Sequence, residues 1–341
     1  MDSKKWIDSH FRDLVNERLV GIKRLHGGIN SLVYHVKSGH GEYVVKKYLY
    51  QKGDRRDRLK TEFETLSFLW KQGVRNIREP LFLVEKEKIG VYRYIKGYSY
   101  KNGDIQKSDV LLVAQFLKKL SKLSKEKDAS KLPMASESAG SMKQYQEILE
   151  QRFKKLIHFK NVSLYKAELT EILDILLPLY QRMKHAMQKA YKMKNRQMGV
   201  SFPSLTLSPS DIGFSNILKT RDGRLFFYDF EYAGWDDPAK TISDFYLHPG
   251  VSLTVKHREL FFVNVVDIAD RKDIYNRLGW VYLLLSIKWC VIMLNPFRLS
   301  DKVDQKEYGQ FAKVKKRLHT IEHDITMRVF PVSLLDASVV I

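Results

Sequence analysis

The spacing of apolar residues changes near Gly97, and this change constrains the fold more than any other feature of the chain. From Leu19 to about Ile95, short runs rich in Val, Tyr, Ile and Phe are separated by glycines and polar residues, which is typical of a small β-sheet. The runs are LVGIKRL, SLVYHVKS, EYVVKKYLY, LFLVEKE and GVYRYI. After Gly97, apolar residues recur three or four positions apart, as on one face of a helix. The pattern predicts an α+β chain with two lobes, a small antiparallel sheet over residues 1–95 and a larger helical lobe over residues 96–341.

One helix is expected within the first lobe, between the third and fourth β-rich runs. In DRRDRLKTEFETLSFLWKQG, the side chains of Leu59, Phe63 and Leu66 share one face, and Gly73 follows as a stop signal. In the second lobe, SDVLLVAQFLKKLSKLS has the same spacing. Further helices are predicted near residues 141–158, 164–193, 255–269, 271–294 and 302–328. Their apolar stripes are expected to form the core of the second lobe.

Length and cysteine content restrict the class of protein. A chain of 341 residues can bury a sizeable core, and its single cysteine, Cys290, cannot form an internal disulfide. Nothing therefore requires an oxidising compartment, and a cytoplasmic protein is expected. The first residues mix acids with bases and contain no apolar stretch, which predicts neither a signal peptide nor a membrane anchor. The apolar run at residues 280–294 is shorter than the roughly 20 residues that cross a bilayer and contains Lys288, so we expect a buried core helix there.

The formal net charge of +20 predicts an attraction for anions such as nucleotides and acidic sugars. The lysines are spread over many segments, which is more typical of solvated helix faces than of one nucleic-acid footprint. The aromatic and basic residues are not interleaved as in the usual RNA-binding sheets. We therefore expect a small anionic partner and no nucleic acid.

Three oxygen-bearing side chains follow one another in SLTLSPSDIGFSNILKTRDGRLFFYDFEYAGWDDPAK. Asp211 and Asn216 belong to one loop, and the strand RLFFYDFE delivers Asp229. Transfer of a phosphoryl group needs a carboxylate that receives the acceptor's proton and oxygen ligands that hold Mg²⁺ on the phosphates. The spacing matches the D-x-x-x-x-N and D-F-G-like layout of kinases. A D-x-x-x-x-N pair arises by chance in a chain this long. The apolar strand that ends in Asp-Phe-Glu therefore provides most of the evidence for a kinase motif.

These elements resemble the aminoglycoside phosphotransferase and choline kinase-like family, which has a protein-kinase-like fold. The family's loop usually reads H-G-D-x-x-x-x-N, its later strand ends in D-F/W-E, and a G-W-x-D-P segment follows; the counterparts here are SPSDIGFSN, YDFEYA and GWDDPAK. The resemblance covers about residues 19–297 and implies ATP and Mg²⁺ as cofactors. It implies that Asp211 is the catalytic base and that Asn216 and Asp229 bind the metal. The implied reaction moves the γ-phosphate to a hydroxyl of a small molecule.

The loop departs from the family's pattern at one position. Pro209, flanked by Ser208 and Ser210, stands where the family usually has His. This His mainly supports the loop in the family, and the three groups that the chemistry needs are present in this chain. An active enzyme is therefore favoured over the alternative, a catalytically weak or inactive ATP-binding pseudokinase with a regulatory role.

The run RLHGGINSLVYHV resembles the family's G-G-x-x-N turn over the phosphates. Gly27 and Gly28 would let the backbone approach the nucleotide closely, and Asn30 and Ser31 would add polar groups. Two glycines between strands are weak evidence by themselves, since a plain hairpin turn also uses them.

A lysine and an acid complete the expected nucleotide site. Lys46 occupies the V-x-K position of the third run, where a kinase lysine reaches the α- and β-phosphates. By resemblance to E-x-x-x-L-x-x-L, Glu62 in the following helix is expected to pair with it. Glu64 is the alternative, because sequence does not fix the rotation of a helix.

The run GVYRYIKG resembles the hinge between kinase lobes. The backbone of Arg93, Tyr94 and Ile95 would then bond the edge of the adenine ring. The competing interpretation is a plain edge strand, and the hinge is favoured only in combination with the loop of the second lobe.

The basic composition disfavours a cationic antibiotic as acceptor, because pockets for aminoglycosides need acidic walls. An anionic sugar or glycan precursor is expected instead. Lys288, inside the apolar run LLLSIKWCVIML, is a candidate acceptor contact, together with Arg277 and Asp244. The competing interpretation of Lys288 is a stem that reaches the surface or an ammonium paired with a nearby carboxylate.

Overall fold

The computed structural model describes residues 3–25, 30–49, 54, 56–160, 163–203, 205–299 and 308–327. The chain divides into two compact units, which we describe separately. Unit 1 comprises Met1–Leu112, Lys119–Ser136 and Leu207–Trp235, and unit 2 comprises Val113–Lys118, Glu137–Thr206 and Asp236–Ile341. The division of the chain into lobes after Ile95 remains a prediction.

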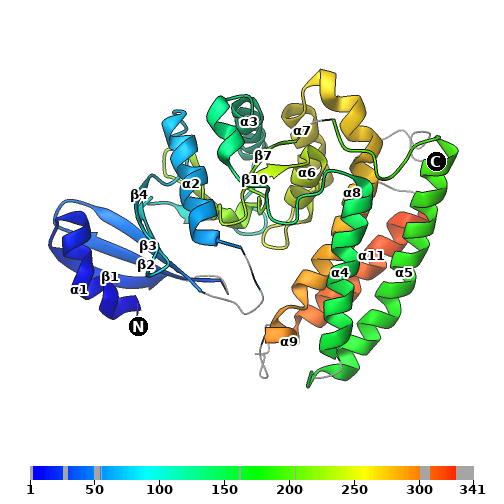
Figure 1. Cartoon of the computed structure of the whole chain (residues 1–341), viewed down its shortest axis with the longest axis horizontal. Helices are drawn as coiled ribbons and strands as arrows, with labels where there is room; N and C mark the ends of the chain where they lie inside the picture. Colours follow the sequence, from blue (N-terminus) through cyan, green and yellow to red (C-terminus); the bar gives the residue numbers. More distant parts are fainter. Residues whose placement is uncertain are drawn as a thin grey trace. The chain divides into compact units, whose positions relative to one another are not determined.

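Unit 1 contains a five-stranded antiparallel sheet in the order β1-β2-β3-β5-β4 (Figure 1). Its strands begin and end close to the β-rich runs of the sequence. They are β1 (Leu19–Leu25), β2 (Ser31–Ser38), β3 (Glu42–Tyr48), β4 (Pro80–Val84) and β5 (Ile89–Arg93). The register pairs Lys46 of β3 with Val33 of β2 and with Gly90 of β5, so Lys46 lies in the interior of the sheet.

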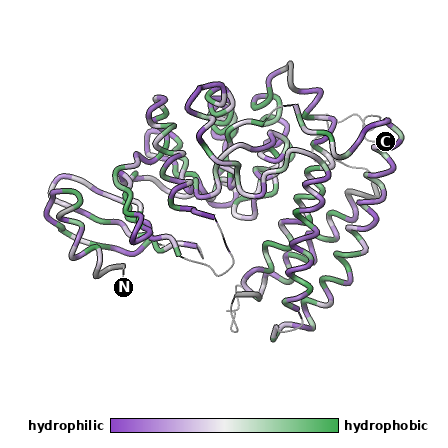
Figure 2. Tube along the Cα trace, viewed as in Figure 1, coloured by the Kyte–Doolittle hydropathy of each residue, from purple (hydrophilic) through white to green (hydrophobic). Residues whose placement is uncertain are grey.

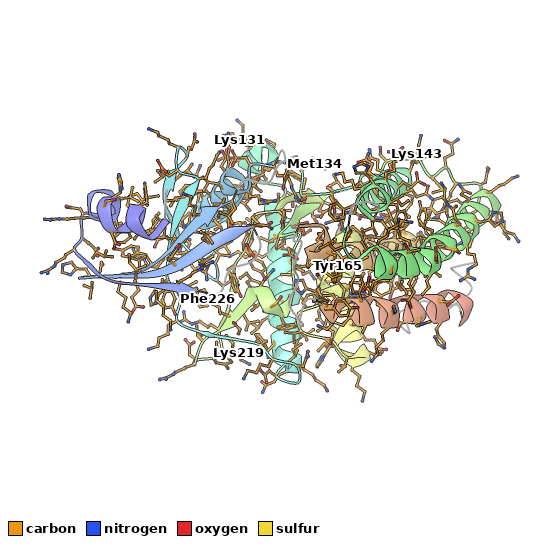
Figure 3. All side chains as sticks on the ribbon, turned by 90° about the horizontal axis from the view of Figure 1, so that it is seen from below. Lys131, Met134, Lys143, Tyr165, Lys219 and Phe226 are labelled. Atoms are coloured by element: carbon orange, nitrogen blue, oxygen red, sulfur yellow. The ribbon has the colours of Figure 1, made fainter. Side chains whose placement is uncertain are left out.

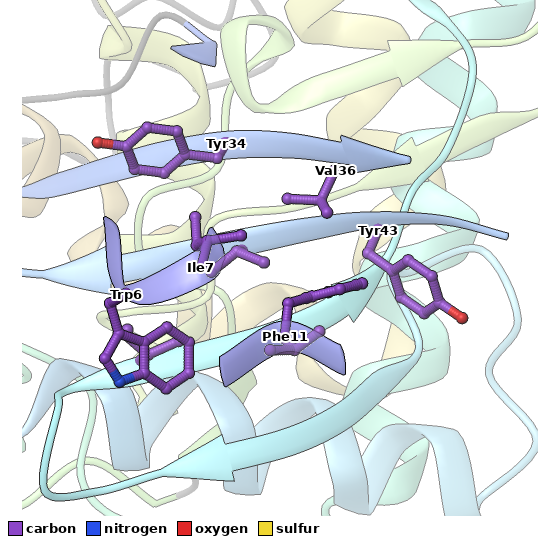
Figure 4. Packing of buried hydrophobic residues seen from close by; sticks show 9 residues of the cluster. Trp6, Ile7, Phe11, Tyr34, Val36 and Tyr43 are labelled. Carbon is purple, nitrogen blue, oxygen red and sulfur yellow. The ribbon is translucent and has the colours of Figure 1, made fainter. Parts of the chain in front are cut away.

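A helix that sequence analysis did not assign covers part of this sheet. Helix α1 (Ser3–Val15) places Trp6, Ile7 and Phe11 on the apolar side chains of the strands (Figure 4). The buried strand residues of this cluster are Tyr34, Val36, Tyr43, Val45, Ile89 and Val91. The interspersed charged residues of α1 obscured a short apolar face that becomes meaningful only once the sheet is formed. Burial of three large side chains holds α1 on the sheet.

Helix α2 (Arg58–Lys71) is the predicted helix of the first lobe. The Asp57 side chain caps its first turn by accepting a hydrogen bond from the Lys60 N–H at 3.1 Å. Gly73 follows with φ of 74°, the left-handed conformation that glycine adopts most readily. The buried face of α2 contains Leu59 and Leu66, as predicted, together with Glu62.

Unit 1 also contains short elements around the loop that contains Asp211. Strand β6 (Tyr98–Ser99) pairs with β8 (Ile217–Lys219), which pairs with β9 (Leu225–Phe227). Strand β7 (Thr206–Ser208) pairs with β10 (Gly234–Asp236), and the 3-10 helix η2 (Phe214–Asn216) lies between β7 and β8 in the chain. The hairpin β8–β9 thus connects the Asp211 loop to Asp229.

Unit 2 is built from helices, along which apolar and polar residues alternate (Figure 2). They include α4 (Met142–Lys160), α5 (Lys166–Met193), α6 (Pro238–Leu247), α7 (Val255–Val265), α8 (Ile268–Met293), α9 (Pro296–Leu299) and α11 (Gln310–Met327). Helix α3 (Lys107–Leu123) contributes residues to both units. Apart from α6 and α9, these helices lie where the apolar spacing predicted them. Residues 302–307 and 328 of the last predicted helix lie outside the described residues.

Aromatic side chains join the helices of unit 2. The ring of Tyr165, labelled in Figure 3, meets that of Phe297 edge-on at 5.3 Å, and Phe297 stacks on Phe311 of α11 at 3.8 Å. These contacts connect the start of α5 to α9 and α11.

Helix α8 contains residues 280–293 of the apolar run and is buried along most of them, as predicted for a core helix. Among the helices that the structure describes, none has the length and apolar character needed to cross a membrane.

Candidate active site

Lys46 of β3 is the centre of a buried charge cluster in unit 1. Its Nζ lies 2.7 Å from Glu62 Oε2, 2.5 Å from Asp229 Oδ1 and 3.0 Å from Glu231 Oε2. The Glu64 side chain is 43% exposed and lies 3.7 Å from Lys60 Nζ instead. Strand β3 supplies the lysine, α2 supplies Glu62, and the chain after β9 supplies the other two carboxylates.

The carboxylates of this cluster outnumber its single ammonium. Burial lowers the pKa of Lys46, but Asp229, Glu62 and Glu231 outweigh burial and raise that pKa well above its ordinary value. Burial raises the pKa of Glu231, and its two carboxylate neighbours raise it further against the effect of Lys46. The buried Arg58 guanidinium lies 3.9 Å from Glu231 Oε1, so a further cation would be stabilised at the more exposed Asp229.

One oxygen from each of Glu62, Asp229 and Glu231 lies within 4.8 Å of the others, a separation suited to a shared cation. The side chain of Asp229 is 35% exposed, whereas those of Glu62 and Glu231 are 3% and 4% exposed. Asp229 is therefore the carboxylate that can meet a ligand from solvent, and the two glutamates hold Lys46 from the protein side. Asp229 has φ of 69°, a left-handed conformation rare outside glycine and common at functional sites.

The loop before Asp211 is shaped by serine and backbone groups. The Ser210 N–H donates to Ser208 Oγ at 3.0 Å, and the Asp211 N–H donates to the Pro209 carbonyl at 2.8 Å. Ser210 also has a left-handed φ, of 65°. Ser208 thus supports the loop next to the position where the family usually has His, a role that sequence analysis did not assign.

Asn216 connects this loop to the strand that carries Asp229. Its Nδ2 donates to the Asp211 carbonyl at 2.8 Å and to Asp211 Oδ2 at 3.3 Å. The Asn216 carbonyl accepts from the Tyr228 N–H at 3.2 Å, and the Tyr228 hydroxyl donates to the Ser215 carbonyl at 2.6 Å. The chain next to Asp229 is therefore tied to the Asp211 loop. Because Nδ2 faces Asp211, the amide oxygen of Asn216 is the atom available to a metal.

Two of the predicted phosphate-loop residues, Gly27 and Gly28, lie outside the described residues. Asn30 Nδ2 donates to Glu231 Oε1 at 2.9 Å and to the Tyr232 hydroxyl, so Asn30 fixes an acid of the charge cluster. Ser31 is buried at the start of β2, where it pairs with Tyr48 of β3.

The predicted hinge residues lie at the end of β5 and just after it. The Arg93 N–H donates to the Glu79 carbonyl at 2.9 Å, and the Tyr94 N–H donates to the Glu42 carbonyl at 3.0 Å. Within the described part of the chain, the Ile95 N–H is the one of the three without a backbone acceptor. Ile95 is thus the residue of this group that has a donor to offer to a base.

The predicted acceptor contacts lie in unit 2, in networks of buried ion pairs. Arg277 Nη2 lies 2.8 Å from Asp237 Oδ1, and the same Asp237 carboxylate accepts from the Ala239 N–H at 3.0 Å at the start of α6. Asp244 Oδ2 lies 3.0 Å from Lys240 Nζ. Arg277 and Asp244 are therefore already engaged by charges of the protein.

Lys288 is less closely held than these residues. Its Nζ lies 3.8 Å from Glu137 Oε2 and 3.9 Å from Asp244 Oδ1, beyond hydrogen-bond distance. Burial lowers the pKa of Lys288 against the effect of Asp244. The adjoining cavity, lined by Glu137, Tyr145 and Leu284, has a volume of about 10 Å³, which is the size of one water.

Glu137 provides a test of this network. Burial raises the pKa of Glu137, but Lys288 and Arg152 outweigh burial and hold that pKa at about 2. A depressed folded-state pKa stabilises the fold above the unfolded value and loses this effect as pH falls. We expect Glu137→Gln to lower the free energy of unfolding by roughly 1–3 kcal/mol at neutral pH, with the difference from wild type vanishing between about pH 4.5 and pH 2.

Urea unfolding of both proteins across this pH range measures the difference. Glu147→Gln is the matched control, because Glu147 is 52% exposed and lies 4.0 Å from its lysine partner. A Glu137→Gln effect that is constant with pH, or no larger than that of the control, would contradict the assignment.

Sequence analysis missed Glu231 as a partner of Lys46. The motif Asp-Phe-Glu placed a second carboxylate two residues after Asp229. The assigned partner, Glu62, already satisfied the expected lysine–acid pair, and the second glutamate was left without a role.

Unit 1 thus combines an antiparallel sheet that carries Lys46, three carboxylates around this lysine, and an Asp211 loop connected through Asn216 to the segment of Asp229. These features define a kinase-like phosphotransferase. Residues 21–188 match the model of the phosphotransferase enzyme family. This match confirms the predicted resemblance to the family, and the motifs SPSDIGFSN and YDFEYA lie beyond the matched residues. The prediction of a kinase that acts on a hydroxyl acceptor is also confirmed, and the pseudokinase alternative has no support.

Solved structures have the same fold. A spectinomycin phosphotransferase in complex with ADP and spectinomycin matches with a TM-score of 0.66 at 12% identity, over 93% of this chain and 98% of its own. Choline kinase LicA from Streptococcus pneumoniae matches with 0.60 at 17% identity, over 94% and 100%. An ADP-bound aminoglycoside phosphotransferase, APH(2'')-Ib, matches with 0.60 at 18% identity, over 94% and 98%. These likenesses confirm the predicted α+β kinase-like fold. No curated protein matches the sequence.

Proposed function

We propose that this protein uses ATP and Mg²⁺ to transfer the γ-phosphate to a hydroxyl of a small molecule, with Asp211 as the general base. The observation that carries the proposal is the connection of Asp211 to Asp229 through Asn216, next to a buried lysine that three carboxylates surround. A general base and a set of metal ligands are what phosphoryl transfer requires of a protein. ADP in two structural neighbours agrees with a nucleotide at this site.

Asn216 and Asp229 are the proposed metal ligands. An amide and a carboxylate oxygen suit Mg²⁺, which bound between nucleotide and protein supplies charge stabilisation for the transferring phosphoryl group. Glu62 and Glu231 are the proposed anchors of Lys46, because both are buried and in contact with its ammonium. Asp229 would hold the cation, and Lys46, held by Glu62 and Glu231, would be placed to meet phosphate oxygens. Asn30 fixes Glu231, and Gly27, Gly28 and Ser31 are the proposed surroundings of the phosphates.

For the adenine ring, we propose the segment Arg93, Tyr94 and Ile95, with the Ile95 N–H as the donor. The Arg93 and Tyr94 N–H groups already donate to backbone carbonyls. These two residues would therefore meet the adenine ring through other atoms or shape its surroundings. For the acceptor, we propose an anionic sugar or glycan precursor, supported by the net charge of +20. Lys288 is the candidate contact, and Arg277 and Asp244 are proposed to position the helices around it. A cytoplasmic location is proposed because ATP is abundant there.

Purified protein with ATP and Mg²⁺ should release ADP only when the right hydroxyl compound is added. A panel that contains anionic, uncharged and cationic hydroxyl compounds decides the acceptor class, and mass analysis of the product locates the new phosphate. Turnover with cationic compounds alone would reject the anionic acceptor and leave the phosphotransfer proposal intact. Removal of Mg²⁺ by EDTA should abolish ADP release, and added Mg²⁺ should restore it.

Asp229→Asn is expected to raise the Mg²⁺ concentration for half-maximal turnover by roughly 10- to 100-fold, because a charged ligand becomes neutral. Titration of ADP release with Mg²⁺ at saturating ATP measures the change. Asp222→Asn, the same substitution at a carboxylate that is 54% exposed in the preceding turn, should leave the Mg²⁺ dependence unchanged. An Asp229→Asn enzyme with wild-type Mg²⁺ dependence would remove Asp229 from the metal site.

A further inference from the structure

A second cavity, of about 290 Å³, lies within unit 2 among α6, α7, α8 and α11. Four cationic residues line it: Arg258, Lys313, Lys316 and Arg317. Among the described residues, no aspartate or glutamate lines it, in contrast to the acidic cluster of unit 1. Tyr282 of α8 and Leu247 of α6 add apolar surface. The helices α8 and α11 lie side by side (Figure 1).

The positive charges of this cavity are not neutralised by the described part of the protein. Within that part, no carboxylate forms a salt bridge with any of the four residues. Arg258 Nε is buried and finds no acceptor among the described residues. The Arg317 guanidinium donates to the Leu247 carbonyl at 2.8 Å, a neutral partner.

The neighbours of Arg317 do not supply a negative charge either. Burial lowers the pKa of Arg317, and the charge of Arg258 lowers it further. The Cys290 thiol lies nearby, but burial raises its pKa to about 12, so it stays neutral near pH 7. Like charges that are held together with an unused buried donor indicate a missing anion.

We propose that this cavity binds a small organic phosphate that carries at least two negative charges. Guanidinium groups match phosphate oxygens in geometry, and two exposed lysines at the rim add charge without fixed directions. The volume is near the lower end for small-molecule sites and exceeds what one inorganic ion needs. Tyr282, Leu247 and Ile321 provide a surface for the carbon skeleton of the ligand. This site is separate from the residues proposed for catalysis, so it is a candidate for an effector.

Isothermal titration calorimetry with fructose 1,6-bisphosphate, in the presence of saturating MgADP, tests the proposal. MgADP occupies the proposed nucleotide site, so that binding of the probe reports either this cavity or the proposed acceptor site, and the loss of binding in the cavity variant distinguishes the two. Wild type is expected to bind one equivalent, with an affinity that weakens as KCl is added. The double variant Lys313→Gln/Lys316→Gln is expected to lose about tenfold or more in affinity. Both lysines are exposed, so the variant should fold as wild type does, which circular dichroism checks.

The double variant Lys189→Gln/Lys192→Gln is the matched control. It removes the same charge from two exposed lysines three residues apart on α5, and neither of them lines the cavity. The control should bind within twofold of wild type. No binding to wild type, or equal losses in the two double variants, would overturn the proposal. MgADP binding should be the same in all three proteins, which separates this site from the phosphotransfer site.

Discussion

Asp211→Asn is expected to lower the turnover number by roughly 10² to 10⁴, the usual contribution of a general base. The substitution keeps the shape of the side chain but removes its ability to accept the hydroxyl proton. The Asn216 Nδ2 contacts to this residue run to its backbone carbonyl at 2.8 Å and its carboxylate at 3.3 Å, so the shorter contact is retained. The loop should therefore keep its conformation. Initial rates of ADP release at saturating acceptor, ATP and Mg²⁺ measure the effect.

The nucleotide affinity provides the internal control for this variant. Asp211 does not contact Lys46, whose three carboxylate partners in the described structure are Glu62, Asp229 and Glu231. MgADP should therefore stabilise Asp211→Asn and wild type against heat to the same extent. Asp222→Asn should keep wild-type turnover. Turnover of Asp211→Asn within twofold of wild type would assign the base elsewhere.

Gly234→Ala is expected to reduce the free energy of unfolding by about 3–5 kcal/mol. Gly234 has φ of 153°, which L-residues rarely adopt, and a Cβ there would lie 2.2 Å from the Pro133 carbonyl oxygen and 2.6 Å from the Ala135 nitrogen. Both atoms belong to backbone that β10 holds. The Trp235 N–H donates to the Pro133 carbonyl at 2.9 Å, and the Ala135 N–H donates to the Trp235 carbonyl at 3.0 Å. Relief of the clash would break these hydrogen bonds.

Urea unfolding compares this variant with Gly21→Ala. Gly21 lies in β1, and no described atom lies within 4 Å of the position that a Cβ would take there, so alanine fits. The control should change the free energy of unfolding by less than about 1 kcal/mol. Equal midpoints for the two variants would show that the backbone at Gly234 yields easily.

Local pattern was sufficient for the strands and most helices. The runs at residues 19–25 and 31–38 became β1 and β2 with the predicted bounds, because alternating apolar residues need only a neighbouring strand to be satisfied. Helix α1 was missed because its apolar residues Trp6, Ile7 and Phe11 are few and lie among charges. Helix α6 was missed because it is only ten residues long, beginning at Pro238.

The partner of Arg277 could not be predicted from the sequence. An arginine in a basic lobe suggested a contact for an anionic acceptor. In the structure, Arg277 bonds Asp237, forty positions earlier in the chain, and both side chains are buried. The separation of the two residues in the sequence does not indicate this ion pair, because the pair forms only when α8 packs on the start of α6.

By itself, the sequence was sufficient for the resemblance to the phosphotransferase family and for the kinase-like fold, and it predicted Asp211, Asn216, Asp229 and Lys46 as site residues, because these depend on residue types at short, fixed spacings. Only the tertiary structure decided how charges are paired. It surrounded Lys46 with three carboxylates, neutralised Arg277 with Asp237, and left Arg258 and Arg317 together without a carboxylate among the described residues. The physical reason is that the energy of a charge depends on its burial and its nearest opposite charge, and both are set by the packing of segments far apart in the chain.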